Sequence, residues 1–139
     1  MKKVVYICHP FRGEVAANRD RVRRLCAAVK RDYVPLAPHL MLPAYIDEAT
    51  ERSLALEHGL ALLRGADEVW VCGPRVSDGM AGEIAEASRL GLPVYRIDVD
   101  WLLTRSGSDR YAKVLWACAP AQTVVPGLPH VRSRFGERE

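Results

Sequence analysis

Two short segments of the sequence concentrate side chains that could bind an anion and act as a nucleophile. Ser77, Asp78 and Gly79 come directly before a stretch with helical period, and Glu83 lies one turn further along it. The free N–H groups and the dipole at a helix start favour a bound anion, and Gly79 lets a ligand approach the backbone closely. A carboxylate one turn along can point into the same cleft as a nucleophile or general base. The alternatives are helix capping by Ser77 or Asp78 and a surface glutamate at position 83.

The second segment is the loop after the first apolar run, where Arg12 stands next to Gly13. An arginine can clamp a phosphate through two parallel hydrogen bonds. His9 follows the first apolar run and His39 follows the second, so both are candidates to approach the same site. For each histidine, a structural or solvated role is the simpler alternative.

Neither a metal site nor a nucleic-acid site is expected. The four cysteines, Cys8, Cys26, Cys72 and Cys118, form no C-x-x-C pair, and the four histidines form no H-E-x-x-H motif. Buried reduced thiols are the expectation for Cys8 and Cys72. The net charge of +3 permits an anionic ligand without demanding nucleic acid. The basic residues between positions 19 and 31 have no aromatic residues among them, which favours a solvated helix face over a nucleic-acid patch.

Length and composition indicate one compact domain. With 139 residues, 49% of them hydrophobic and 27% charged, the chain is of ordinary globular type. We expect a single domain over residues 1–119 and a loosely packed tail over residues 120–139, where prolines and charges collect. No stretch approaches the roughly 20 apolar residues of a membrane span, and the apolar run after the first lysines is too short for a secretory signal. A cytoplasmic protein is therefore expected.

The elements that must position the candidate residues alternate between strand and helix. Apolar runs predict strands over residues 3–8, 33–36, 67–73 and 93–97. Helical periodicity predicts helices over residues 13–31, 47–64 and 79–90, the second capped by Asp47 and buried through Ser53, Leu56, Leu60 and Leu63. Residues 100–104 are expected to form a helical turn, and residues 111–119 a last helix or strand.

Such alternation is typical of an α/β fold with three αβα layers around a flavodoxin- or Rossmann-like parallel sheet. We expect four or five strands in the order 2-1-3-4(-5). Ligands of such sheets bind at the carboxyl ends of the strands where the strand order reverses. That point lies between the first and third strands, so the loops over residues 9–13 and 74–79 should meet there.

The same segments resemble the nucleoside 2-deoxyribosyltransferase superfamily. Residues 5–13 resemble its opening strand and loop, in which a tyrosine is followed by an arginine–glycine pair, and residues 66–73 resemble its third strand. Residues 77–87 and 90–94 resemble its signature of a serine or aspartate, a glycine two residues on and a glutamate six residues on. The likeness is strongest to the 2′-deoxynucleoside 5′-phosphate N-hydrolase branch and to small, mostly uncharacterised, often phage-associated members.

This resemblance implies roles for the candidate residues. Glu83 would attack the anomeric carbon of a deoxynucleoside 5′-monophosphate and form a glycosyl-enzyme ester, with Tyr6 orienting it. The substrate-binding residues expected from the loops and the resemblance are His9, Arg12, Gly13, His39, Ser77, Asp78, Gly79 and Met80. The implied partner is a small nucleotide or nucleoside, with no cofactor, no nucleic-acid polymer and no membrane, and the implied assembly is a homodimer or larger. The apolar segment over residues 40–45 suits a subunit contact or a lid over the cleft.

One position departs from the pattern. The superfamily usually carries an aspartate on the helix before the third strand, and spacing places Gly59 there. A non-catalytic nucleotide-binding or regulatory module of the same fold is therefore the alternative function. A flavodoxin-like receiver or FMN binder is disfavoured, because the first loop lacks a Ser/Thr-rich phosphate cradle and no acidic pair follows the first strand.

Overall fold

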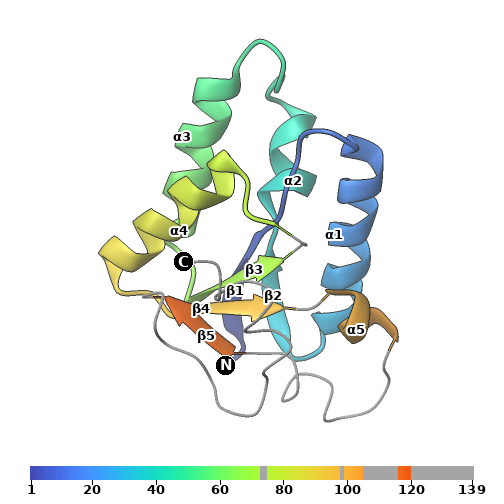
Figure 1. Ribbon diagram of the computed structural model, residues 1–139, viewed down its shortest axis with the longest axis vertical. Helices are drawn as coiled ribbons and strands as arrows, with labels where there is room; N and C mark the ends of the chain where they lie inside the picture. The colour runs from blue at the N-terminus through green and yellow to red at the C-terminus, as the bar shows by residue number, and fades with distance from the viewer. Residues whose placement is uncertain (73–74, 98, 105–115, 120–139) are drawn as a thin grey trace.

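The sheet has the predicted strand order. The computed structural model describes residues 1–72, 75–97, 99–104 and 116–119 (Figure 1). The strands β1 (Lys3–Cys8), β2 (Tyr33–Leu36), β3 (Glu68–Cys72) and β4 (Val94–Ile97) are parallel in the order β2-β1-β3-β4. A fifth strand, β5 (Trp116–Ala119), pairs with β4 at the edge and runs antiparallel, unlike the all-parallel sheet expected. The predicted tail over residues 120–139 lies outside the described residues.

Helices cover both faces of the sheet, which gives the three layers. Figure 1 shows α1 (Val15–Val29) and α5 (Val99–Thr104) on one side and α3 (Arg52–Leu63) and α4 (Asp78–Leu90) on the other. Helix α4 ends at Gly91, whose φ of 76° is the left-handed conformation that glycine adopts without strain. Where a loop was expected, Pro38 and Pro43 open two short helices, α2 (Pro38–Met41) and η1 (Leu42–Ala44), because proline suits the first turn of a helix.

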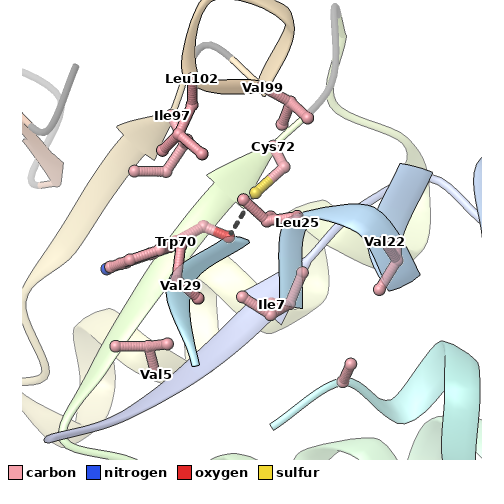
Figure 2. Close-up of a cluster of buried hydrophobic side chains, with 11 residues drawn as sticks. Val5, Ile7, Val22, Leu25, Val29, Trp70, Cys72, Ile97, Val99 and Leu102 are labelled. Carbon is pink, nitrogen blue, oxygen red and sulfur yellow. Dashed lines mark hydrogen bonds between the residues drawn. The ribbon is translucent and has the colours of Figure 1, made fainter. Parts of the chain in front are cut away.

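Strand β1 sends alternate side chains to the two faces, as the pleat of a strand requires. Val5 and Ile7 join the cluster under α1 and α5, which Figure 2 shows around Trp70. Tyr6 and Cys8 point the other way, into the cluster under α3 and α4. Burying a large apolar side chain contributes about 1.5–3 kcal/mol, so these two clusters fix the register of β1. Tyr6 and Cys8 therefore stand side by side facing α4.

The predicted start of α3 is wrong, and its predicted buried face is right only in part, since Leu63 is fully buried and Leu60 packs against the core. Asp47 opens a tight turn, in which its side chain accepts a hydrogen bond from the Ala49 amide at 2.9 Å, and the helix begins only at Arg52. The buried residues of the helix are Ala55, Gly59 and Leu63. Leu56, expected in the core, is 42% exposed. Apolar residues occupy nearly every face of α3, so the spacing of apolar residues in the sequence does not identify which face is buried.

Candidate active site

The central feature of the site is a carboxylate held by strand β1. The Tyr6 hydroxyl donates a hydrogen bond to Glu83 Oε2, and the Cys8 sulfur lies 3.2 Å from Glu83 Oε1. Tyr6 and Cys8 are fully buried, whereas Glu83 is only partly buried and lines a cavity. The register of β1 and the second turn of α4 thus place one carboxylate where β1 meets the cavity.

The cavity, about 270 Å³ in volume, lies at the carboxyl ends of β1 and β3. The predicted site residues that line it are His9, Arg12, His39, Ser77, Asp78, Gly79, Met80 and Glu83. The two loops expected at the switch point therefore do meet at one cleft. Gly13 is not among the lining residues; it lies exposed beside Arg12 with a φ of 90°, which turns the loop into α1. Tyr6 is also not a lining residue and acts on the cleft through Glu83.

The start of α4 keeps hydrogen-bond donors for a ligand. The Ser77 hydroxyl caps the helix, accepting from the Met80 amide at 3.3 Å, so the capping alternative is correct for this side chain. The hydroxyl proton is still available to donate, since a serine hydroxyl is donor and acceptor at once. The amides of Asp78 and Gly79 occupy the first turn, where no intrahelical acceptor exists. Capping and anion binding are therefore compatible here.

Sequence reasoning missed Arg52, which also lines the cleft. Its Nη1 lies 2.6 Å from Glu48 Oε1, and its Nη2 lies 3.6 Å from where a Cβ atom on Gly79 would be. The guanidinium is thus close to the start of α4. The sequence did not single out Arg52 because the predicted helix start at Asp47 placed this arginine in the second turn. In the structure Arg52 is the first residue of α3.

Gly59, on α3, faces the hydrogen-bonded pair of Tyr6 and Glu83. A Cβ atom added there would lie 3.2 Å from the Tyr6 hydroxyl oxygen and 3.6 Å from Glu83 Oε2. The first distance is tighter than nine in ten real Cβ contacts. A side chain at this position would therefore require the Tyr6 hydroxyl or α3 to shift by a few tenths of an ångström.

Burial sets the protonation of the central pair. It raises the pKa of Glu83, while hydrogen bonds from Tyr6 and Cys8 and the charge of His39 oppose the rise. Burial, reinforced by the nearby Glu83 carboxylate, also raises the pKa of Tyr6. The Tyr6 hydroxyl therefore stays protonated and donates a hydrogen bond to Glu83. The pair is thus a protonated phenol hydrogen-bonded to a carboxyl group whose pKa is higher than usual.

The two candidate histidines are held by backbone and ring contacts. His39 Nε2 donates to the His9 carbonyl oxygen, and the His39 ring lies 5.0 Å from the Phe11 ring. Burial lowers the pKa of His9, whose Nδ1 lies 2.8 Å from the Pro10 carbonyl oxygen, so this ring is neutral. These contacts show that both histidines help to build the wall of the cleft.

Replacing Glu83 by glutamine should stabilise the folded chain above neutral pH. The unfolded chain releases the Glu83 proton near the ordinary pKa of 4.5, whereas the folded chain holds it to higher pH. Wild-type stability is therefore lost as pH rises from 4.5 through the raised value, a loss that glutamine avoids. We expect a higher melting temperature for Glu83→Gln at about pH 8 and no difference below about pH 4, measured by thermal unfolding.

Glu86→Gln is the matched control on the same helix. Glu86 pairs with Arg89 at 2.5 Å, and this bond lowers its pKa, so the same substitution should reduce stability at neutral pH. Equal melting temperatures for wild type and Glu83→Gln across the pH range would show that burying the ionised Glu83 carboxylate does not destabilise the folded chain.

Within the part of the chain that the structure describes, no three His, Cys, Asp or Glu side chains come together as a metal site. In the same residues, every helix is too short or too polar to cross a membrane.

Fold and site together define an α/β protein in which a partly buried carboxylate, that of Glu83, lines a cleft at the switch point of the parallel strands. Residues 3–97 match the family described as a domain of unknown function (DUF7768), and the chain belongs to that family. It is similar to the solved structure of a 2-deoxyribosyltransferase from the psychrotolerant bacterium Bacillus psychrosaccharolyticus, with a TM-score of 0.55 and 18% identity over 68% of this chain and 71% of that one. This similarity confirms the predicted αβα fold. No curated protein matches the chain.

Proposed function

We propose that this chain cleaves or transfers at the N-glycosidic bond of a deoxynucleoside 5′-monophosphate, with Glu83 as the nucleophile. The observation that carries the proposal is the hydrogen-bonded Tyr6–Glu83 pair, which lies at the edge of a cleft beside the start of α4. The structural neighbour is named a 2-deoxyribosyltransferase, which supports nucleoside chemistry on this fold. The small ligand expected is therefore a nucleotide or nucleoside.

The proposed reaction has two steps, formation and breakdown of an ester between Glu83 and the sugar. A Glu83 carboxylate oxygen forms a bond to the sugar C1′ while the C1′–N bond breaks. The electron pair of the C1′–N bond leaves with the base, which takes up a proton from solvent. Attack of water on C1′ then breaks the ester bond, frees the sugar phosphate and returns the carboxylate, and the proton of the water goes to solvent. Attack of a second base instead forms a new nucleotide, and the proton of that base goes to solvent. Tyr6 keeps the carboxylate oriented through its hydrogen bond, and the negative charge of Glu83 stabilises the cationic sugar of the transition state.

A 5′-phosphate would occupy the other end of the cleft. The amides at the start of α4, the Ser77 hydroxyl and the Arg12 guanidinium offer donors to it, and Arg52 adds a second cation. Serine at position 77, where transferases of the superfamily usually carry aspartate, favours the 5′-phosphate hydrolase branch. Glycosyl transfer and a phage-associated origin remain part of the proposal.

Removing the Arg12 side chain should weaken nucleotide binding selectively. One charge-assisted hydrogen bond contributes about 1.5–3 kcal/mol, so Arg12→Ala should raise the Kd of a deoxynucleoside monophosphate at least about tenfold. The Kd of the unphosphorylated nucleoside should change little, because the lost contact is to phosphate. Calorimetry measures both, and Arg31→Ala is the control, since Arg31 is exposed and not among the lining residues. Equal losses for nucleotide and nucleoside would place the phosphate elsewhere.

The activity itself is tested by incubating the purified chain with each deoxynucleoside monophosphate and each deoxynucleoside, then separating free base by chromatography. Release of free base from a monophosphate supports hydrolysis, and exchange with an added second base supports transfer. Binding without release from any compound supports the second candidate, a nucleotide-binding or regulatory module. The observation that favours this candidate is Gly59, which leaves the position of the usual aspartate without a side chain.

Assembly into a homodimer or larger remains a prediction. Two apolar side chains of the segment that was expected to form a subunit contact or a lid, Met41 and Tyr45, are exposed at 38% and 63%. Leu42 and Pro43 of the same segment instead line the cleft. The segment is therefore shared between the wall of the site and the surface.

A further inference from the structure

We propose that Cys8 is a positioning residue for Glu83: its thiol donates a hydrogen bond to Oε1 while the Tyr6 hydroxyl holds Oε2. The inference rests on the proposed function only for its kinetic consequence. The contact itself is a property of the folded chain, with a sulfur–oxygen distance of 3.2 Å. Tyr6 and Cys8 stand two residues apart on one face of β1, so a single strand presents both donors to one carboxylate.

The distance requires a proton between the two atoms. A sulfur and a carboxylate oxygen at 3.2 Å would repel each other if both were acceptors, whereas a thiol can donate, although weakly. The terminal torsion of a glutamate is broad, so one hydrogen bond leaves the carboxylate free to swing. A donor on each oxygen fixes its plane, and a fixed plane favours attack along one direction.

The structural role of a buried cysteine is the competing explanation. Cys8 is fully buried in the cluster with Met80, and its sulfur also lies 3.9 Å from the Met80 carbonyl oxygen. Cys72 offers a matched comparison, because it is equally buried on the neighbouring strand β3. Its sulfur lies 3.5 Å from the Trp70 carbonyl oxygen of its own strand, and its side chain belongs to the opposite cluster. Loss of packing alone should affect both positions, whereas loss of a donor to Glu83 should affect only position 8.

Several other groups face the cleft and remain unchanged in the variants proposed below. They are His39 from α2, Arg52 from α3 with its partner Glu48, Asp78 from α4, and His9, Arg12 and Arg75 from the loops. Any change in the titration of Glu83 between variants therefore reports the substitution on β1.

The experiment is an NMR titration of the full chain labelled with ¹³C at the glutamate carboxyl carbon. The Glu83 signal is assigned by its absence from Glu83→Gln. We expect the Glu83 midpoint to be highest in Cys8→Ala, which has no donor, and lowest in Cys8→Ser, whose hydroxyl is a stronger donor than the thiol. Wild type should lie between them, and Cys72→Ala should match wild type. The same Glu83 midpoint in wild type, Cys8→Ala and Cys8→Ser would overturn the proposal.

Kinetics give the second readout. Losing one hydrogen bond should lower kcat of Cys8→Ala about two- to tenfold with KM nearly unchanged, and Cys8→Ser should restore it. If Cys8→Ala does not fold, the serine variant decides alone, since a Glu83 midpoint not lower than that of wild type contradicts the proposal. If wild type releases no base, the proposed function fails, but the order of the midpoints still decides the role of Cys8.

Discussion

Replacing Glu83 by glutamine should abolish base release while leaving nucleotide binding intact. The amide keeps the shape of the carboxylate and can still accept from Tyr6, but it cannot form the ester with C1′ or stabilise a cationic sugar. Loss of a nucleophile should lower kcat by at least about 10³-fold, because the residue acts only in bond breaking. Free base measured over hours, with Kd measured by calorimetry, separates the two effects.

The control for this result is Glu86→Gln, one turn further along α4. Glu86 is held outside the cleft by Arg89 and by Arg64 at 3.7 Å, so its loss should change kcat less than about twofold. Base release that persists in Glu83→Gln at a wild-type rate would contradict the covalent mechanism. A fall in the Glu86 variant equal to that in the Glu83 variant would mean that the helix, and not the carboxylate, is what both substitutions disturb.

The sequence was sufficient for the parts of the site that local signals determine. The continuous apolar runs of β1 and β3, buried on both faces, predicted a parallel sheet and hence the switch point. Ser77, Gly79 and Gly91 predicted where α4 starts and ends. They thereby placed Glu83 one turn after the helix start, where it lines the cleft. These features depend on residues close together in the chain.

The remainder depended on contacts between distant residues. Arg52 was missed because Asp47 has the residue type of a helix cap but forms an isolated turn. The contact of Cys8 with Glu83 joins residues 75 positions apart and follows from the register between β1 and α4, which no local pattern contains. The antiparallel direction of β5 was similarly hidden, since a four-residue strand has no sequence signal for the direction of its partner.

Gly59 separates two accounts of the site that the sequence left open. If the glycine is merely a lost catalytic acid, Gly59→Asp should create or increase activity. The geometry predicts the opposite, because a Cβ atom there already lies 3.2 Å from the Tyr6 hydroxyl oxygen. A carboxylate beyond that Cβ would stand next to Glu83, and the repulsion of like charges would raise the Glu83 pKa further. We expect base release by Gly59→Asp to be undetectable.

Gly59→Ala isolates the steric part of this effect. Tyr6 is fully buried and cannot retreat freely, so the added methyl group should displace its hydroxyl from Glu83 by a few tenths of an ångström. Misplacing a catalytic group on this scale should lower kcat about ten- to a hundredfold. The matched control is Gly82→Ala in α4, where an added Cβ meets no atom within 4 Å. This control should keep full activity and gain up to about 1 kcal/mol of stability, because alanine is the better helix former.

The outcome depends on which of the three glycine variants changes base release. Loss in both Gly59 variants, with an unaffected Gly82→Ala, establishes that the glycine is needed for the close approach of α3 to Tyr6 and Glu83. Gain of activity in Gly59→Asp over wild type contradicts this account and shows that α3 can move to admit a side chain. That gain would be most telling if wild type releases no base at all, because the chain would then be a nucleotide-binding module that one aspartate returns to catalysis.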